Sequence, residues 1–182
     1  MNHTASYNVP AIVMHWLVAL LIAVTFPIAW VMVDMQDDSP EQLSWFAVHM
    51  SIGLTVFMLA ALRLINRLFS GAPAAPANTP AVVRKLTGAI HLALYALMFT
   101  VPITGWIMVS AGGHAVSFFG LFSVPNIVVQ DDGLHETMEG LHETVANVLL
   151  GLIALHTAAA LKHHIIQRDD VLARMLPFLR KR

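Results

Sequence analysis

The chain has 182 residues, of which 57% are hydrophobic and 12% are charged, and it contains no cysteine. An ordinary soluble domain has a charged fraction of about 25%, so this composition excludes one and indicates a membrane protein. Without thiols the chain cannot form disulfides, ligate zinc or iron–sulfur clusters through sulfur, or attach a haem covalently. Its ten histidines are therefore the residues that need a chemical explanation.

Four segments are apolar and long enough to cross a bilayer as helices, which takes about 20 residues each. They lie near residues 11–33, 43–62, 86–111 and 142–161. The expected fold class is an all-α integral membrane protein, a four-transmembrane-helix bundle, with residues 1–182 forming a single membrane domain. The first segment is expected to be retained, because residues 1–10 lack the Lys or Arg of a signal peptide.

Lys and Arg are completely segregated along this layout. All ten Lys and Arg fall on one side of the bundle, and nine of the eleven acids fall on the other. By the positive-inside rule, both termini, the 63–85 connection and the basic tail 162–182 are cytoplasmic. The tail suits either anionic lipid head groups or a solvated position.

One further apolar segment follows the third predicted helix, over residues 115–129. It is broken by Gly120 and Pro125 and is too short to span the bilayer. We therefore expect an interfacial or re-entrant segment on the outer side, which could cover a site at that face.

Five histidines lie within the predicted helices at two depths. His15, His91 and His156 lie near the cytoplasmic ends of their helices, whereas His49 and His142 lie near the outer starts of theirs. His142 and His156 are 14 residues apart, so they share one face of the last helix about 21 Å apart. That separation prevents them from sharing one zinc ion.

Histidines paired at matching depths on facing helices are the arrangement that two stacked haems with two imidazole ligands each would need. At the outer depth the pair is His49 with His142. At the inner depth any two of His15, His91 and His156 would serve, and the spacing does not choose among them. The remaining imidazole could hydrogen-bond a quinone or simply pack.

The order of short motifs along the chain resembles the prokaryotic cytochrome b561 family. The likeness covers all four helices, from about residue 7 to Pro177. The motifs are HW at residues 15–16, VHMSIG at 48–53, HLALYALMFTVPITGW at 91–106, LHETVAN at 141–147 and LHTAAALKHH ending at residue 164.

The resemblance implies two non-covalent b-type haems, with iron ligated by His15 and His156 at the inner site and by His49 and His142 at the outer site. His91 would then be free to take part in a quinone region. The implied activity is that of a superoxide oxidase in the bacterial inner membrane, which passes electrons from superoxide through both haems to ubiquinone. Membrane lipid, ubiquinone and superoxide or a redox partner protein are the expected partners, and nucleic acid is not.

Two alternatives to a superoxide oxidase remain open. The outer face carries no Lys or Arg to attract superoxide, and His114 in SAGGHAVSF stands where family members carry a basic residue. An acidic outer face also suits a cytochrome b subunit that relays electrons between a partner dehydrogenase and the quinone pool. A histidine-lined proton or metal transporter is the non-redox alternative.

Overall fold

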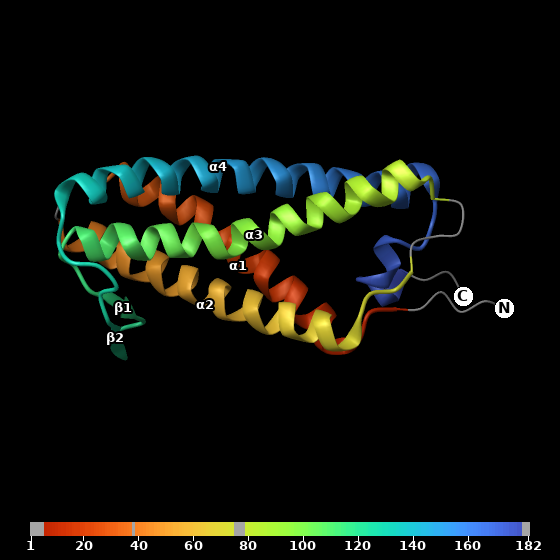
Figure 1. Ribbon diagram of the computed structural model, residues 1–182, viewed down its shortest axis with the longest axis horizontal. Helices are drawn as coiled ribbons and strands as arrows, with labels where there is room; N and C mark the ends of the chain where they lie inside the picture. Colours follow the sequence, from red (N-terminus) through yellow and green to blue (C-terminus); the bar gives the residue numbers. More distant parts are fainter. Residues whose placement is uncertain (1–5, 38, 75–78, 180–182) are drawn as a thin grey trace.

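The computed structural model describes residues 6–37, 39–74 and 79–179. His3, Asp38, Pro76 and Arg180 to Arg182 lie outside the described residues. Four long helices run antiparallel to their chain neighbours, and both termini lie at the same end of the bundle (Figure 1). The helices are α1 (Val9–Val33), α2 (Pro40–Ser70), α3 (Ala81–Ala111) and α4 (Asp132–Lys162). All four are long and apolar enough to cross a membrane, which confirms the predicted four-helix membrane bundle.

Short polar side chains define where three of these helices begin. The side chains of Asn8, Ser39 and Asp131 each accept a hydrogen bond from a backbone N–H in the first turn of the helix that follows. Such caps satisfy backbone donors that have no partner within the helix.

The cap at Asp131 corrects one prediction. Helix α4 begins at Asp132 rather than near residue 142, so His142 does not open the helix but lies in its interior. Hydropathy missed the first turns because they are acidic, whereas capping and helix propensity extend the helix beyond its apolar part.

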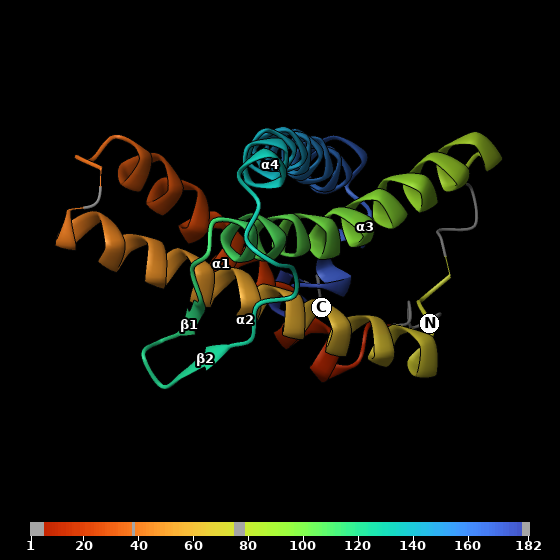
Figure 2. The ribbon, with the colours of Figure 1, turned by 60° about the vertical axis from the view of Figure 1, so that its left-hand side comes forward.

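The segment after α3 forms a β-hairpin, which is a local exception to the predicted all-α fold. Strands β1 (Val116–Phe118) and β2 (Phe122–Val124) pair antiparallel with Val116 opposite Val124. The hairpin lies beside α2 at the end of the bundle opposite the termini, and it projects away from the helices (Figures 1 and 2).

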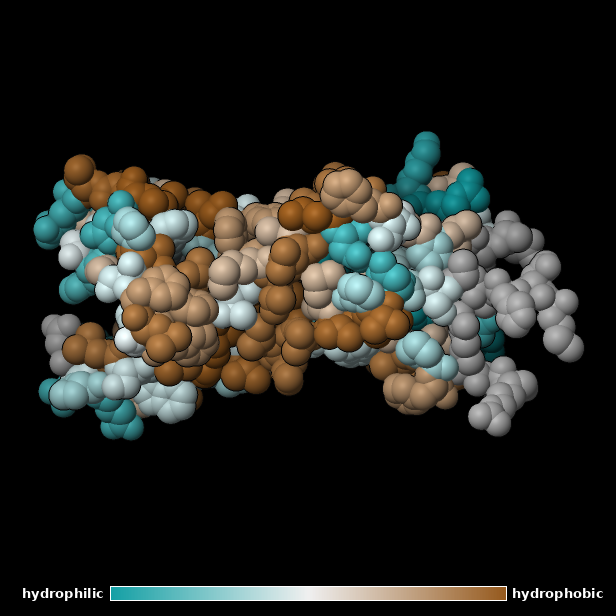
Figure 3. Space-filling view, turned by 90° about the horizontal axis from the view of Figure 1, so that it is seen from below, coloured by the Kyte–Doolittle hydropathy of each residue, from teal (hydrophilic) through white to brown (hydrophobic). Residues whose placement is uncertain are grey.

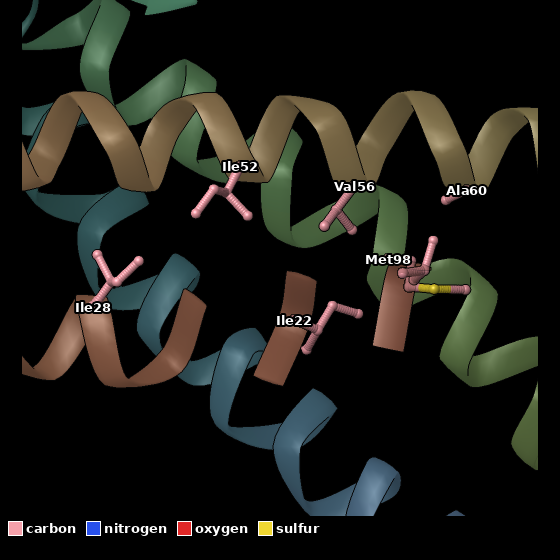
Figure 4. Close-up of a cluster of buried hydrophobic side chains, with 7 residues drawn as sticks. Ile22, Ile28, Ile52, Val56, Ala60 and Met98 are labelled. Carbon is pink, nitrogen blue, oxygen red and sulfur yellow. The ribbon is translucent and has the colours of Figure 1, made fainter. Parts of the chain in front are cut away.

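Apolar side chains cover the middle of the bundle in a band, and polar side chains gather toward its two ends (Figure 3). The buried core is small and comes mainly from α1 and α2, with Met98 from α3 (Figure 4). Its members are Val18, Ile22, Ile28, Ile52, Val56, Ala60 and Met98. Among the described residues of α4, Leu149 alone is buried, so this helix meets the rest of the bundle largely through side chains that are partly exposed.

The predicted basic tail folds back on the bundle as far as Leu179. A π-helical turn (His163–Gln167) ends at Arg168, which has a left-handed backbone with φ of 53°. Short 3-10 turns follow at Leu172–Arg174 and Pro177–Leu179. The indole N–H of Trp16 donates to the Met175 carbonyl at 2.9 Å, and buried Arg174 donates to the Ala74 carbonyl at 2.6 Å. The described part of the tail is therefore a packed element.

Candidate functional site

The two histidines of the outer layer face each other across the bundle. His49 on α2 and His142 on α4 have ring centres 6.3 Å apart and ring planes 77° apart. An imidazole nitrogen lies about 2 Å from a metal that it binds, so two imidazoles on opposite sides of one iron have ring centres roughly 6 to 6.5 Å apart. The observed separation fits a single metal atom between the two rings.

Backbone and side-chain groups of α3 fix the orientation of His142. Its Nδ1 lies 2.9 Å from the Val101 carbonyl oxygen and 3.2 Å from the Thr104 hydroxyl. Because a carbonyl only accepts hydrogen bonds, Nδ1 carries the proton and Nε2 is left to bind a metal.

A glycine permits this close approach of the ring to α3. A Cβ atom built on Gly105 would lie 3.0 Å from Cε1 of His142 and 3.2 Å from its Nδ1. A side chain at position 105 would therefore require the His142 ring to shift by a few tenths of an ångström.

An apolar cavity adjoins the outer pair. Its walls come from all four helices and from both strands of the hairpin, and His49 and His142 are among the lining residues. Cofactor sites are typically apolar pockets with a few convergent polar groups. Gly53, whose Cβ position has no neighbour within 4 Å, also lines the cavity and leaves room beside His49.

The inner layer brings together His15, His91 and His156, among which the spacing in the sequence does not choose a ligand pair. The ring centres of His15 and His156 are 6.4 Å apart, whereas those of His91 and His156 are 5.3 Å apart. The first separation fits two imidazoles on opposite sides of one iron, and the second is too short for that arrangement. His15 also contacts Trp16 edge to face, with ring centres 5.1 Å apart.

Two further features of the inner layer agree with a bound group at this site. The buried Nδ1 atom of His15 has no hydrogen-bond partner among the described residues. Arg63 lies over the Tyr95 ring at 5.5 Å and interacts electrostatically with His15, His91 and His156. No ion pair within the described ranges neutralises the half-buried Arg63, so an anionic group on a bound cofactor would offset its partial desolvation.

Two other basic residues at this end of the bundle already have partners. Arg67 donates to the Tyr7 hydroxyl at 3.3 Å, and Arg84 donates to the Thr79 carbonyl at 2.9 Å. Arg63 is therefore better placed than either of them to pair with an anionic group on a bound cofactor.

The two predicted outer-face histidines meet at Gly112, away from the histidine layers. A Cβ on Gly112 would lie 3.0 Å from Nδ1 of His135 and 3.5 Å from Cδ2 of His114. The His135 Nδ1 lies 2.9 Å from the Met108 carbonyl. His135 therefore contacts Met108 and Gly112 in the same way as His142, seven residues later on α4, contacts Val101 and Gly105 on α3. At the other end, His163 pairs with Asp169 at 2.6 Å.

Sequence reasoning missed the residues that orient the histidines. Gly105 and Thr104 lie within the TVPITGW motif, but nothing in their order shows which side chain they touch. Ser51, within the VHMSIG motif, is fully buried and contacts the hairpin. No group of three or more potential metal-ligating side chains occurs in the part of the chain that the structure covers.

The fold and the paired histidines define a class of membrane proteins that carry electrons on haem held between helices. A family model described as prokaryotic cytochrome b561 matches residues 6–178. The chain is 32% identical over 181 residues to cytochrome b561 homolog 2 of Escherichia coli (strain K12), covering 96% of this chain and 93% of the relative. It is 30% identical over 174 residues to the probable superoxide oxidase CybB of Yersinia pestis, covering 94% and 96%.

The chain belongs to the prokaryotic cytochrome b561 family. It is thus a membrane electron-transfer protein of an oxidoreductase family, and the family implies b-type haem.

Proposed function

We propose that this protein transfers electrons from superoxide at its outer face to ubiquinone in the membrane, using two b-type haems. His49 and His142 ligate the outer iron, and His15 and His156 ligate the inner iron. The observation that carries the proposal is the pair of nearly equal ring separations, 6.3 Å and 6.4 Å, at two depths of one bundle.

A haem supplies an iron that takes up and releases one electron at a time. Two superoxide anions each lose one electron and leave as O₂, and one quinone takes up two electrons and two protons to become the quinol. The protein's own contribution is to hold the imidazoles, exclude water from the bundle and deliver protons to the quinone.

The residues present fit a haem at each layer. At the outer layer, the contact of the His142 Nδ1 atom with the Val101 carbonyl leaves Nε2 free to bind iron, and His142 and His49 both line the cavity. At the inner layer, the Arg63 guanidinium would pair with a propionate by charge-assisted hydrogen bonds. His91 lies next to His156 without the separation of a ligand pair, so its imidazole would be free to hydrogen-bond a quinone carbonyl and pass a proton to it.

The same proposal fixes the orientation in the membrane. Both termini and the 63–85 connection face the cytoplasm, and the hairpin and the acidic start of α4 face the outer side of a bacterial inner membrane. The support is that every Lys and Arg among the described residues lies at one end of the bundle.

Rapid mixing tests the proposal directly. Pulses of superoxide added to the purified oxidised protein should reduce its haems within the lifetime of the pulse, and added ubiquinone should reoxidise them. If the haems stay oxidised after superoxide, the proposed donor is wrong. If reduced haems persist with ubiquinone present, the proposed acceptor is wrong.

A second function, electron relay from a protein donor, is favoured by the charge of the outer end. Among the described residues at the outer end, every Asp and Glu is exposed and there is no Lys or Arg. These acids are Asp34, Asp37, Glu41, Asp131, Asp132, Glu136, Glu139 and Glu143. Such a surface attracts a basic redox partner and repels an anion. Haem reduction by a co-purifying partner, slowed by added salt, would favour this function over superoxide oxidation.

A further inference from the structure

We propose that the β1–β2 hairpin is a re-entrant element whose aromatic tip inserts into the outer leaflet of the lipid bilayer. The proposal concerns how the protein sits in the membrane and does not depend on the electron donor. It rests on the depth of the hairpin, on the hydrogen bonds of its turn and on the side chains at its tip.

The depth of the hairpin in the membrane follows from its contact with α2. The Ser51 hydroxyl accepts a hydrogen bond from the Phe119 N–H at 2.8 Å and lies 3.0 Å from the Ser117 carbonyl. Ser51 is fully buried and lies ten residues after Glu41, which is about 15 Å along the helix axis. No Asp, Glu, Lys or Arg occurs in α2 between Glu41 and Arg63. The turn of the hairpin is therefore held at a level where α2 itself is apolar.

Three successive backbone N–H groups at the turn have hydrogen-bond partners. Besides the bond from Phe119 to Ser51, the Gly120 N–H donates to the Ser117 hydroxyl at 3.2 Å and the Leu121 N–H donates to the Phe118 carbonyl at 2.9 Å. In water these groups would need no internal partner, but in hydrocarbon each unsatisfied group costs several kcal/mol. Left-handed backbone angles at Phe119 and Gly120, with φ of 50° and 72°, make this compact turn possible.

The side chains at the tip are large, apolar and exposed. Phe119 is 52% exposed, Leu121 is 77% exposed and Phe122 is 57% exposed. The Phe118 ring lies 5.0 Å from that of Phe119 and 5.1 Å from that of Phe122. The sequence from Ala115 to Gln130 contains no charged residue. Exposed clusters of this kind mark a contact surface, and here the apolar band of the bundle lies directly beside it (Figure 3).

The base of the hairpin is fixed to the bundle while the tip projects outward (Figure 2). Val116 and Val124 are buried and line the outer cavity, and the Trp106 indole donates to the Pro125 carbonyl at 3.1 Å. Aromatic hairpin residues then occupy the boundary between head groups and acyl chains, as amphipathic segments do at depths of about 5–10 Å. The occupant of the apolar surface is lipid, and the base of the hairpin forms part of the wall of the outer cavity.

The absence of cysteine makes a direct measurement possible. A nitroxide label on Leu121→Cys is measured by power saturation in the haem-loaded protein, reconstituted in nanodiscs of phosphatidylcholine and phosphatidylglycerol. Labels on Leu20→Cys, an exposed site in the middle of α1, and on Glu136→Cys, an exposed site at the outer start of α4, mark lipid and water.

The label at position 121 should be more accessible to oxygen than to a polar nickel reagent, as the label at position 20 is. Accessibility equal to that at position 136 would overturn the proposal. Spin–spin broadening at position 121 in discs that hold two copies, and its loss in discs that hold one, would assign the surface to a second copy and also overturn it.

A matched pair of variants tests the role of Ser51. Ser51→Ala should shift the label at position 121 toward the polar reagent, because the Phe119 N–H loses its acceptor at that depth. Ser44→Ala changes a serine on the same helix that donates only to the Pro40 carbonyl, and it should leave the label unchanged. An equal effect of the two substitutions would contradict the proposed anchoring.

Discussion

The His142 ring owes its position to α3 as much as to its own helix. Its Nδ1 contacts Val101 and Thr104, and its carbon atoms pack against the backbone at Gly105. A metal-ligating histidine commonly donates its other N–H to such a group, which fixes both the tautomer and the ring direction. The sequence identifies His142 as a candidate, but only the folded chain shows what orients it.

Substitution of Gly105 by alanine should therefore weaken the outer site selectively. The added methyl group would lie 3.0 Å from the His142 ring, and loss of an orienting contact typically costs about 10- to 100-fold in metal affinity or activity. We expect loss of the outer haem, measured as haem content and as one component of a redox titration. Gly140→Ala, at a position with no neighbour within 4 Å of the Cβ, is the control and should keep both haems.

Arg63 provides the second prediction at this scale. Its half-buried positive charge favours the electron-rich form of a nearby cofactor, so Arg63→Gln should lower the midpoint potential of the inner haem. Arg63→Lys should keep most of the potential, and Arg84→Gln, an exposed change at the same end, should have no effect. An unchanged inner potential in Arg63→Gln would exclude Arg63 as a propionate partner.

The choice among His15, His91 and His156 shows where the sequence stops being informative. All three can be placed at one depth from helix position alone, because depth depends only on the number of residues from the helix end. Their mutual distances depend on the rotation and tilt of three helices, which hydropathy does not encode. The separations of 6.4 Å and 5.3 Å distinguish the pairs.

Among the elements, the helices that cross the membrane could be predicted from the sequence, whereas the structured segments at the ends of the bundle could not. Apolar runs located all four helices, since a bilayer leaves the backbone few alternatives. The acidic start of α4 and the hairpin depend on local contacts, at Asp131 and at Ser51. For the same reason the tail, predicted only as basic, proved to be folded through Trp16 and Arg174.

The folded tail gives a prediction at the scale of elements. Trp16→Phe removes the hydrogen bond to the Met175 carbonyl, and a hydrogen bond of this kind contributes about 0.5–1.5 kcal/mol. Local opening of the tail should become about 2- to 10-fold more frequent, which is measured as faster tryptic cleavage after Arg168 or Arg174. Trp30→Phe, an exposed tryptophan near the other end of α1, is the control, and equal cleavage of the two variants would contradict the packing role of the tail.

At the scale of the molecule, a net charge of -1 conceals a strongly polarised protein. The basic end carries the termini and the folded tail, and the acidic end carries the hairpin and the extension of α4. Between these ends lie two layers of paired histidines, joined by α4, which contributes one imidazole to each. This arrangement suits movement of electrons along the membrane normal between a donor on one side and quinone within the bilayer.

The most direct test is the haem content and reduced-minus-oxidised spectrum of the purified protein, compared with those of His142→Ala, His156→Ala, His15→Ala and His91→Ala. Two low-spin b haems are expected in the unaltered protein. His142→Ala should lose only the outer haem, His156→Ala only the inner one, and His91→Ala neither. Loss of the inner haem in His91→Ala with its retention in His15→Ala would contradict the proposed pairing, and absence of any b-haem spectrum would contradict the account as a whole.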